Sequence, residues 1–292
     1  MEGRILKGVG GFYCVDTGEA LYECRAKGGF RKEGISPLVG DRVEIVPEPG
    51  SQDVGTIVSI RPRSNELIRP RSANADQIFL VFSAAVPRPS FELLNRYLVV
   101  MAETGVPVVL IVTKADLMES EAEEEIRKAF RGTAYPIRFC SSKTGAGIEE
   151  VRETLYRKMT VFAGPSGVGK SSLVNALIGH AAMEVGALSK KIECGKNTTR
   201  HTELFALGES TYILDTPGFS SIDYDFVEKD NLALNFEEFI PYLTKCRYSN
   251  CTHRKEEDCA VRAAVSEGKL SEVRYRCYVD MMDHLLSLRR YS

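Results

Sequence analysis

Apolar and polar residues alternate in five short runs within the first 60 residues, and glycines separate the runs. The runs cover residues 4–6, 11–15, 20–24, 41–46 and 55–60. Alternation of this kind predicts short β-strands. Five strands in so short a region favour a small closed barrel of the oligonucleotide/oligosaccharide-binding (OB) type, because closure removes exposed sheet edges. An open β-meander is the alternative.

From residue 75 the pattern changes to apolar strands that alternate with amphipathic helices, which predicts a parallel sheet covered by helices on both faces. Strands are expected at 77–82, 108–112, 136–139, 160–163 and 212–214, and helices at 91–103, 119–130, 148–158 and 173–178. The preceding segment, 61–71, is rich in arginine and proline and lacks periodicity, so it is interpreted as an interdomain linker.

Beyond Tyr224 the chain has short helical segments and a terminal amphipathic run from Leu270 to Arg290. The chain is therefore expected to be a multidomain α/β protein. Its predicted parts are an N-terminal OB-fold barrel (1–62), a central domain with a phosphate-binding loop (63–224) and a mainly helical C-terminal domain (225–292).

Composition narrows the possible function classes. The formal net charge at pH 7 is −2, so any RNA-binding argument must rest on local patches. The longest apolar stretch, Val106 to Val112, is far shorter than the roughly 20 residues needed to span a bilayer. The first residues lack the apolar run of a secretory signal. We therefore expect no membrane partner and a cytoplasmic location.

A phosphate loop of the form GxxxxGK[ST] follows the predicted strand at 160–163 and precedes a predicted helix. It consists of Gly164, Pro165, Ser166, Gly167, Val168, Gly169, Lys170 and Ser171. Its backbone N–H groups and the helix N-terminus would bind the β- and γ-phosphates, Lys170 would bridge them, and Ser171 would ligate Mg²⁺. A chance match is disfavoured because the strand and the helix both stand where the mechanism needs them.

The run Asp215-Thr216-Pro217-Gly218 follows the predicted strand at 212–214 and fits a DxxG element. Asp215 would hold Mg²⁺ through water, and the Gly218 N–H would contact the γ-phosphate. Alone, this tetrapeptide would be an ordinary turn. Its position after the phosphate loop makes the assignment as a DxxG element specific.

Two further elements indicate guanine recognition. Thr113, Lys114, Ala115 and Asp116 follow a buried strand, and Ser141, Ser142 and Lys143 follow the next one. The Asp116 carboxylate would accept two hydrogen bonds from guanine, a donor pair that adenine lacks. For the tetrapeptide alone, a helix-capping aspartate would be the favoured reading. Together the two elements imply GTP, although they precede the phosphate loop instead of following it.

The aperiodic segment from Gly186 to His201 resembles a mobile first switch, with a solvated basic loop as the alternative. Either Thr198 or Thr199 would complete Mg²⁺ coordination, and the sequence leaves both open. Phe219 stands where many regulatory GTPases have a glutamine that orients water, which predicts slow intrinsic turnover.

Cys246, Cys251, His253 and Cys259 form a C-x4-C-x-H-x5-C cluster, which supplies three thiolates and one imidazole. Four such ligands match tetrahedral Zn²⁺ with no open position, so a structural zinc ion is expected. Unrelated buried cysteines are the alternative.

The inverted motif order, the N-terminal β-domain and the Cys/His cluster together resemble the circularly permuted, small-subunit-dependent GTPases called RsgA or YjeQ, over nearly the whole chain. The resemblance implies GTP hydrolysis in late maturation of the small (30S) ribosomal subunit, stimulated by that subunit, with GTP/GDP and rRNA as ligands. It extends the phosphate site to Ser172. We expect a monomer.

One departure concerns the first switch. The family usually has a histidine before the two threonines, whereas this chain has Asn197. An amide orients water but does not shuttle a proton. Hydrolysis would therefore use another helper, with His201 as a candidate, or depend more on the ribosome.

Local basic residues bear on RNA binding. Arg25, Lys27, Arg31 and Lys32 lie near Tyr22 and Phe30 in a predicted barrel loop, and residues 61–71 contain four arginines. A charged linker and solvated face would explain these residues alone, while the family resemblance favours rRNA contact. Two rival functions are a kinase that uses the same loop and a GTP-gated RNA-binding module with negligible hydrolysis.

Overall fold

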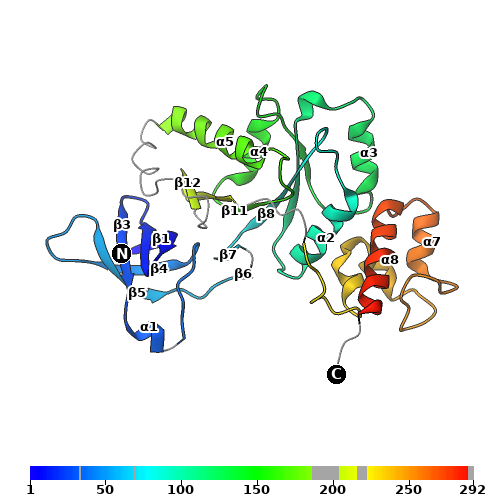
Figure 1. Cartoon of the computed structure of the whole chain (residues 1–292), viewed down its shortest axis with the longest axis horizontal. Coiled ribbons are helices and arrows are strands. Elements are labelled where there is room, and N and C mark those ends of the chain that lie inside the picture. Colours follow the sequence, from blue (N-terminus) through cyan, green and yellow to red (C-terminus); the bar gives the residue numbers. More distant parts are fainter. Residues whose placement is uncertain (33, 69, 186–203, 216–221, 289–292) are drawn as a thin grey trace.

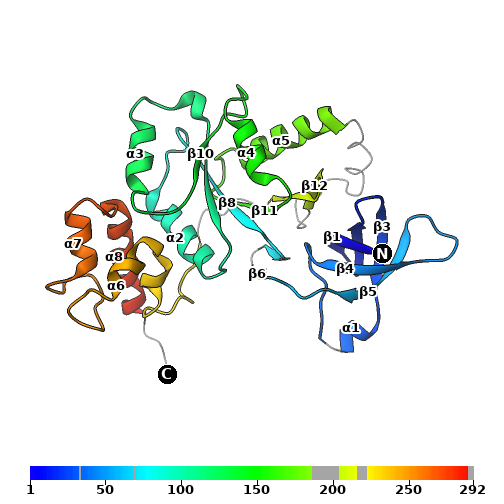
Figure 2. The ribbon, with the colours of Figure 1, turned by 180° about the vertical axis from the view of Figure 1, so that it is seen from behind.

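The computed structural model describes residues 1–32, 34–68, 70–185, 204–215 and 222–288. A small barrel and a group of C-terminal helices lie at opposite ends of a central sheet domain, as the two views in Figures 1 and 2 agree. Within these ranges, every helix is too short or too polar to cross a bilayer.

The N-terminal part is a closed five-stranded barrel, which confirms the OB-fold prediction. Its strands are β1 (Glu2–Val9), β2 (Phe12–Asp16), β3 (Leu21–Ala26), β4 (Arg42–Pro47) and β5 (Val54–Ile60), with the short helix α1 (Gly29–Lys32) after β3. The order is β1-β2-β3-β5-β4; β3 and β5 pair in parallel and the other pairs are antiparallel. Alternate side chains fill the interior, namely Ile5, Val15, Cys24, Val43, Ile45 and Ile57.

The segment interpreted as an interdomain linker leads into a small hairpin of β6 (Glu66–Ile68) and β7 (Arg71–Ala73). Side-chain amides hold its base: Asn74 Oδ1 accepts from the Ser64 amide at 2.9 Å, and Asn65 Nδ2 donates to the Ala75 carbonyl at 2.8 Å. Strands this short lack a readable period, so the sequence did not predict the hairpin.

The central part is a six-stranded sheet in the order β10-β9-β8-β11-β13-β12. The strands are β8 (Gln77–Ser83), β9 (Val108–Thr113), β10 (Ile137–Phe139), β11 (Met159–Ala163), β12 (Leu204–Gly208) and β13 (Thr211–Asp215). All neighbours pair in parallel except β12, which is antiparallel to β13. The parallel sheet is confirmed, whereas β12 was not predicted.

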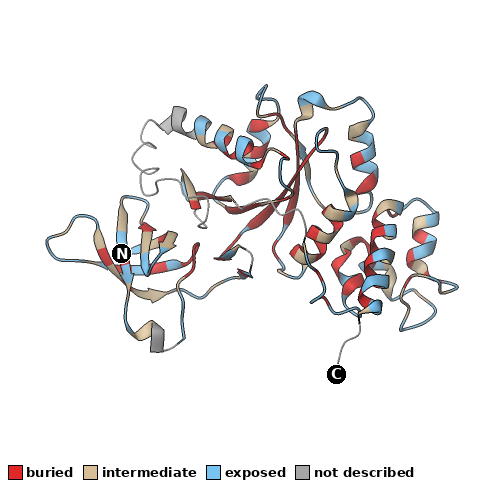
Figure 3. Ribbon diagram, viewed as in Figure 1, coloured by how far each residue is buried: buried red, intermediate tan, exposed pale blue. Residues whose placement is uncertain are grey.

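Both faces of this sheet are buried, so its strands are continuous apolar runs. On β8, Ile78, Leu80 and Phe82 pack on one face, and Phe79 and Val81 pack on the other. The first face is covered by α2 (Phe91–Ala102) and α3 (Ala122–Ala129), and the second by α4 (Ile148–Leu155) and α5 (Lys170–Val185). Figure 3 shows the buried sheet as the red centre of the molecule.

The C-terminal part is helical. It comprises η3 (Leu232–Asn235), η4 (Glu237–Phe239), α6 (Ile240–Leu243), α7 (Ala260–Ser266) and α8 (Glu272–Ser287). At its centre Phe236 stacks on Phe239, and Tyr278 meets both rings edge-on. Val99 of α2 joins the same cluster. These helices therefore pack directly on the sheet domain. The predicted boundaries at residues 62 and 224 stay predictions.

The barrel contacts the other edge of the sheet domain through buried side chains. The Arg4 guanidinium of β1 lies 4.8 Å from the centre of the Tyr212 ring on β13, and the Tyr212 hydroxyl donates to Asp16 at 3.5 Å. Burial lowers the pKa of Arg4, and the nearby Tyr212 opposes this shift. The barrel is thus fixed to the strand that ends at Asp215.

Candidate GTP and metal sites

The predicted nucleotide elements meet at one edge of the sheet. Strands β9, β10, β11 and β13 are parallel, and their carboxyl ends lead to Thr113, Ser141, Gly164 and Asp215 respectively. The strand order reverses between β8 and β11, because β9 follows β8 on one side and β11 lies on the other. In open α/β sheets, ligands bind at such a switch point.

The phosphate loop needs its glycines for backbone reasons. Gly164, Gly167 and Gly169 have φ values of 139°, 77° and 98°, where side chains are disfavoured. A Cβ on Gly164 would lie 2.1 Å from the Val81 carbonyl oxygen. The loop ends at Lys170, the first residue of α5. A helix N-terminus after a glycine-rich loop binds anions with its free N–H groups.

Lys170 is held inside this loop. Its ammonium donates to the carbonyl oxygens of Gly164 at 2.9 Å and Pro165 at 2.7 Å, and only 6% of the residue is exposed. Two of the three ammonium protons are thereby used, which leaves one for a phosphate oxygen. Burial lowers the pKa of Lys170, while Asp215 raises it. A bound phosphate would favour the charged form in the same way.

Ser171 and Asp215 face each other across the loop. The Ser171 hydroxyl donates to Asp215 Oδ2 at 3.5 Å, and Asp215 is the last residue of β13. A hydroxyl and a carboxylate are oxygen ligands of the kind that Mg²⁺ uses beside phosphates. The donor set therefore fits this ion.

The base elements touch the phosphate loop. The Thr113 hydroxyl shares its one proton between the carbonyl of Val168 and, at 3.1 Å, that of Phe82. Lys114, whose φ is 56°, directs its ammonium to the carbonyls of Gly167, at 3.0 Å, and Val86. Thr113 and Lys114 therefore tie the base side of the site to the phosphate side.

Asp116 is oriented by Ser141. It lies in the short helix η1 (Ala115–Leu117), and its Oδ1 accepts from the Ser141 hydroxyl at 2.6 Å. Ser141 is fully buried, and its oxygen also accepts from the amides of Lys143 and Thr144 at 3.3 and 3.2 Å. The exposed carboxylate thus keeps Oδ2 for a ligand. Gly147, with φ of 69°, closes the loop against Phe139.

Several predicted site residues lie outside the described part of the chain. They are Asn197, Thr198, Thr199, His201 and Gly218, together with Phe219. Among the other predicted nucleotide contacts, Ser166 and Ser172 are exposed at the mouth of the loop, while Ser142 is half-buried and Lys143 exposed beside Ser141.

The four predicted zinc ligands come together in the C-terminal part. All their donor atoms lie within 4.8 Å of one another. His253 Nδ1 is 3.4 Å from the sulfur atoms of both Cys246 and Cys259, and these two sulfurs are 3.9 Å apart. Zn–S bonds of about 2.3 Å in a tetrahedron place sulfurs about 3.8 Å apart, so the spacing and the donor set fit Zn²⁺.

Burial raises the pKa of the Cys251 and Cys259 thiols and lowers that of His253. Buried, uncompensated thiolates would be costly, whereas a coordinated divalent cation stabilises them. The electrostatics of the cluster therefore also suit a metal ion.

Sequence reasoning missed the residues that shape this cluster. Glu256 accepts hydrogen bonds from the amides of Thr252 and Arg254 at 2.8 and 2.9 Å, and Tyr275 and Tyr278 donate to the carbonyls of His253 and Thr252, both at 2.9 Å. Burial raises the pKa of Glu256, but hydrogen bonds from the Thr252 hydroxyl and from backbone amides, including those of Thr252 and Arg254, lower it to about 2. The signal available in the sequence was the acidic run between the last two ligands, His253 and Cys259, which contains Glu256.

Comparison with known proteins agrees with this architecture. The RsgA GTPase family model matches residues 60–225, and the RsgA N-terminal domain model matches residues 2–57. The small ribosomal subunit biogenesis GTPase RsgA of Agathobacter rectalis is 44% identical over 302 aligned residues, with all of both chains covered. The protein of the same name from Clostridium perfringens is 42% identical, with 99% of each chain covered.

Two solved structures share the whole fold. YloQ, described as a circularly permuted GTPase, superposes with a TM-score of 0.81 at 37% identity, covering 99% of this chain and 96% of its own. YjeQ from Thermotoga maritima superposes with a TM-score of 0.82 at 32% identity, covering 99% of both chains. The motif order, the sheet and the family match lead to one conclusion: the chain belongs to the RsgA GTPase family and is a GTP-hydrolysing enzyme with a circularly permuted G domain.

Proposed function

We propose that this GTPase acts in late maturation of the small ribosomal subunit. The subunit stimulates hydrolysis of GTP by the protein, and hydrolysis releases the protein from the subunit. The relatives in Agathobacter rectalis and Clostridium perfringens are named for biogenesis of that subunit. The observation that carries the catalytic part is the contact between Thr113 and Val168, because it joins the base-selecting element to the phosphate loop.

In this proposal each residue has a defined task. Asp116, oriented by Ser141, accepts the two guanine donors. Lys170 supplies positive charge to the phosphates, and charge stabilisation is the main protein contribution in phosphoryl transfer. Ser171 would ligate Mg²⁺ and Asp215 would hold it through water, with Thr198 or Thr199 as a further ligand and Gly218 at the γ-phosphate. Asn197 and His201 are the candidates for orienting the water.

The Cys246, Cys251, His253 and Cys259 cluster would hold one structural Zn²⁺. Since all four positions of a tetrahedron are filled by protein, the ion would stabilise the C-terminal helices and take no part in hydrolysis.

The barrel is the proposed rRNA contact. Arg25 lies 4.5 Å from the centre of the Phe12 ring, and Phe12 is 41% exposed. An exposed aromatic ring beside a guanidinium suits base stacking and phosphate binding. Tyr22 and Phe30, which lie near the basic residues in the sequence, are half-buried and pack against the barrel core. We therefore assign the stacking role to the more exposed Phe12.

The test is release of phosphate from GTP and from ATP, each with and without purified small subunits. We expect release only from GTP, and a rise of at least about tenfold when subunits are added. Lys170→Met is the control that removes the phosphate-binding charge. Equal rates in all four conditions would contradict the proposal, and phosphorylation of an added acceptor would favour a kinase.

A further inference from the structure

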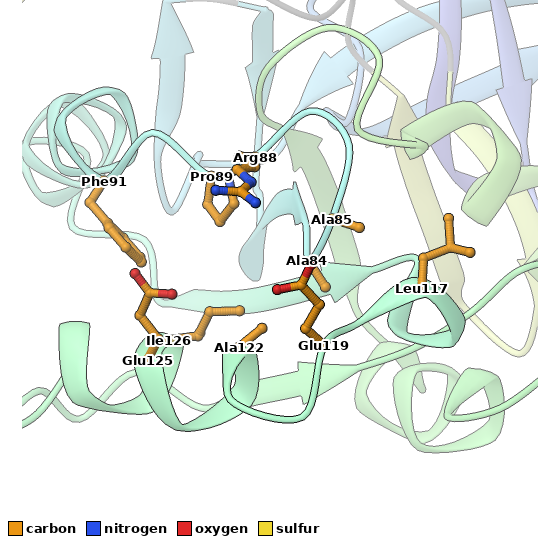
Figure 4. Close-up of a pocket in the computed structure, with 10 residues that line it drawn as sticks. All are labelled: Ala84, Ala85, Arg88, Pro89, Phe91, Leu117, Glu119, Ala122, Glu125 and Ile126. Carbon is orange, nitrogen blue, oxygen red and sulfur yellow. The ribbon is translucent and has the colours of Figure 1, made fainter.

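A cavity of about 180 Å³ lies beside the guanine elements, between the loop after β8 and the start of α3. Figure 4 shows its lining residues, which are Ala84, Ala85, Arg88, Pro89, Phe91, Leu117, Glu119, Ala122, Glu125 and Ile126. No step of GTP binding or hydrolysis described above uses it. It has an apolar floor and a charged rim.

The floor is sized for one apolar side chain. Phe91, Ala122 and Ile126 contribute carbon surface, and Leu117 stands at the edge with 55% of its surface exposed. Cavities of about 150 Å³ accommodate benzene, so this one takes a side chain of the size of leucine or phenylalanine. Burial of such a side chain stabilises a complex through the hydrophobic effect.

The rim is acidic on the α3 side. Five of the seven residues from 119 to 125 are glutamates, and Figure 4 shows the carboxylates of Glu119 and Glu125 pointing toward the loop that carries Arg88. Among the described residues, only Glu123 of these five forms an ion pair, with Arg127 at 2.8 Å. Glutamates in a first helical turn also favour the helix dipole, but that role does not explain the neighbouring cavity.

We propose that this cavity is a docking site for a basic polypeptide segment, with one apolar anchor side chain in the floor and lysine or arginine side chains on the glutamate rim. The negative charge of the rim selects the partner, since clustered carboxylates attract cationic peptides and repel nucleic-acid phosphates. The single cation on the opposite wall, Arg88, is outnumbered by the glutamates.

The site lies next to the nucleotide elements. Leu117 follows Asp116 directly, the Ala84 amide donates to the Thr113 carbonyl at 2.9 Å, and the Lys114 ammonium donates to the Val86 carbonyl. A segment that docks here contacts the loop held by Lys114 and the helix that carries Asp116. Docking is therefore expected to alter the rate of GDP release.

The first experiment measures fluorescence anisotropy with the full-length protein and two labelled peptides. One is a short lysine- and glycine-rich peptide with a central leucine, and its companion has serine in place of the leucine. We expect the leucine peptide to bind about tenfold more tightly than its companion. Equal binding of the two peptides would reduce the interaction to unspecific charge attraction and overturn the proposal, as would no binding of either.

Variants then locate the site. The double substitution Glu119→Gln with Glu125→Gln is expected to weaken binding of the leucine peptide about fivefold or more, whereas Glu124→Gln, on the same helix and outside the cavity lining, has a smaller effect. Arg88→Ala leaves the affinity unchanged or raises it. A loss of affinity with Arg88→Ala, or equal effects of all glutamate variants, would exclude this binding mode.

A labelled single-stranded RNA tests the other class of partner. We expect the double glutamate variant to bind this RNA as the unchanged protein does, because the proposed RNA contact lies on the barrel. A change in RNA affinity would assign the cavity to nucleic acid instead. The peptide assays use neither hydrolysis nor ribosomes, so their result is independent of the proposed function. Only the RNA control rests on the proposed barrel contact.

Discussion

Arg274 of α8 and Glu238 of η4 form a doubly hydrogen-bonded ion pair in which both side chains are almost completely buried. Burial lowers the pKa of Arg274, but Glu238 outweighs this effect and the net shift is upward. Arg274 also donates to Asn95 Oδ1 of α2 at 2.7 Å. One guanidinium thus joins two C-terminal elements to the GTPase domain.

Breaking this pair is expected to loosen the attachment of the C-terminal helices. Arg274→Met leaves the Glu238 carboxylate buried without its partner, a loss of about 3–5 kcal/mol in similar sites. Hydrogen exchange of α8, followed by mass spectrometry, measures the effect. The control is Arg276→Met on the same helix, which removes an exposed pair with Glu272 and costs less than about 1 kcal/mol. Equal exchange in the two variants would refute this prediction.

The zinc content of the protein should depend on the four Cys/His cluster residues and not on buried cysteines elsewhere in the chain. We expect Cys259→Ser to lose the metal and to unfold the C-terminal helices, because binding free energy and folding free energy are linked in structural zinc sites. Cys277→Ser changes another buried thiol, outside the cluster, and should retain one zinc ion per chain by elemental analysis. Equal zinc content in both variants would contradict the assignment.

Ser141 should control guanine affinity through Asp116. Ser141→Ala removes the hydroxyl that orients the carboxylate, at a cost of about 1 kcal/mol, or roughly a fivefold rise in the Kd of labelled GDP. Ser142→Ala, one residue further along the loop, keeps the backbone through which this element would contact guanine, so it should leave the Kd nearly unchanged. If the two variants bind GDP equally, the Asp116 carboxylate is oriented by other contacts.

The loop around Glu256 should be sensitive to acid. Since the folded state lowers the pKa of Glu256 from 4.5 to about 2, its stabilisation is complete above pH 4.5 and is lost as the pH falls toward 2. Glu256→Gln should therefore weaken the near-ultraviolet circular dichroism of the C-terminal tyrosines at neutral pH, and the difference from the unchanged protein should shrink below pH 4.5. Glu257→Gln is the matched neighbour, and an equal loss with it would refute the role of Glu256.

Asn197, in the predicted first switch, gives a fifth prediction, from sequence alone. A histidine at this position exchanges protons near neutral pH, so Asn197→His should raise the subunit-stimulated rate of a single turnover. His201→Ala in the same background tests whether His201 already serves as the helper. An unchanged or lower rate with Asn197→His would show that the amide is not limiting.

The sequence predicted those parts whose signal is local. Each of three features follows from a pattern within a few residues: the glycines of the phosphate loop, the apolar strands β8 and β9, and the spacing of the Cys/His cluster.

The parts that were missed depend on contacts that no single short run of residues reveals. The hairpin at 66–73 is fixed by the amides of Asn65 and Asn74, and strand β12 exists because Leu204 and Phe205 pair with β13. The cavity beside Leu117 is built from two loops that lie more than a whole strand and helix apart. Such tertiary contacts leave no periodic trace.

Strand β13 has a mechanical consequence. Tyr212 carries the contact with Arg4 of the barrel, and Asp215 ends the same strand beside Ser171. Three residues of extended chain, about 10 Å, separate the two. A β-strand hydrogen-bonded on both sides hardly stretches. A displacement of the barrel therefore displaces the Asp215 carboxylate next to the phosphate loop as well. A load applied to the barrel would reach Asp215 along the backbone, with no loop between them to absorb it.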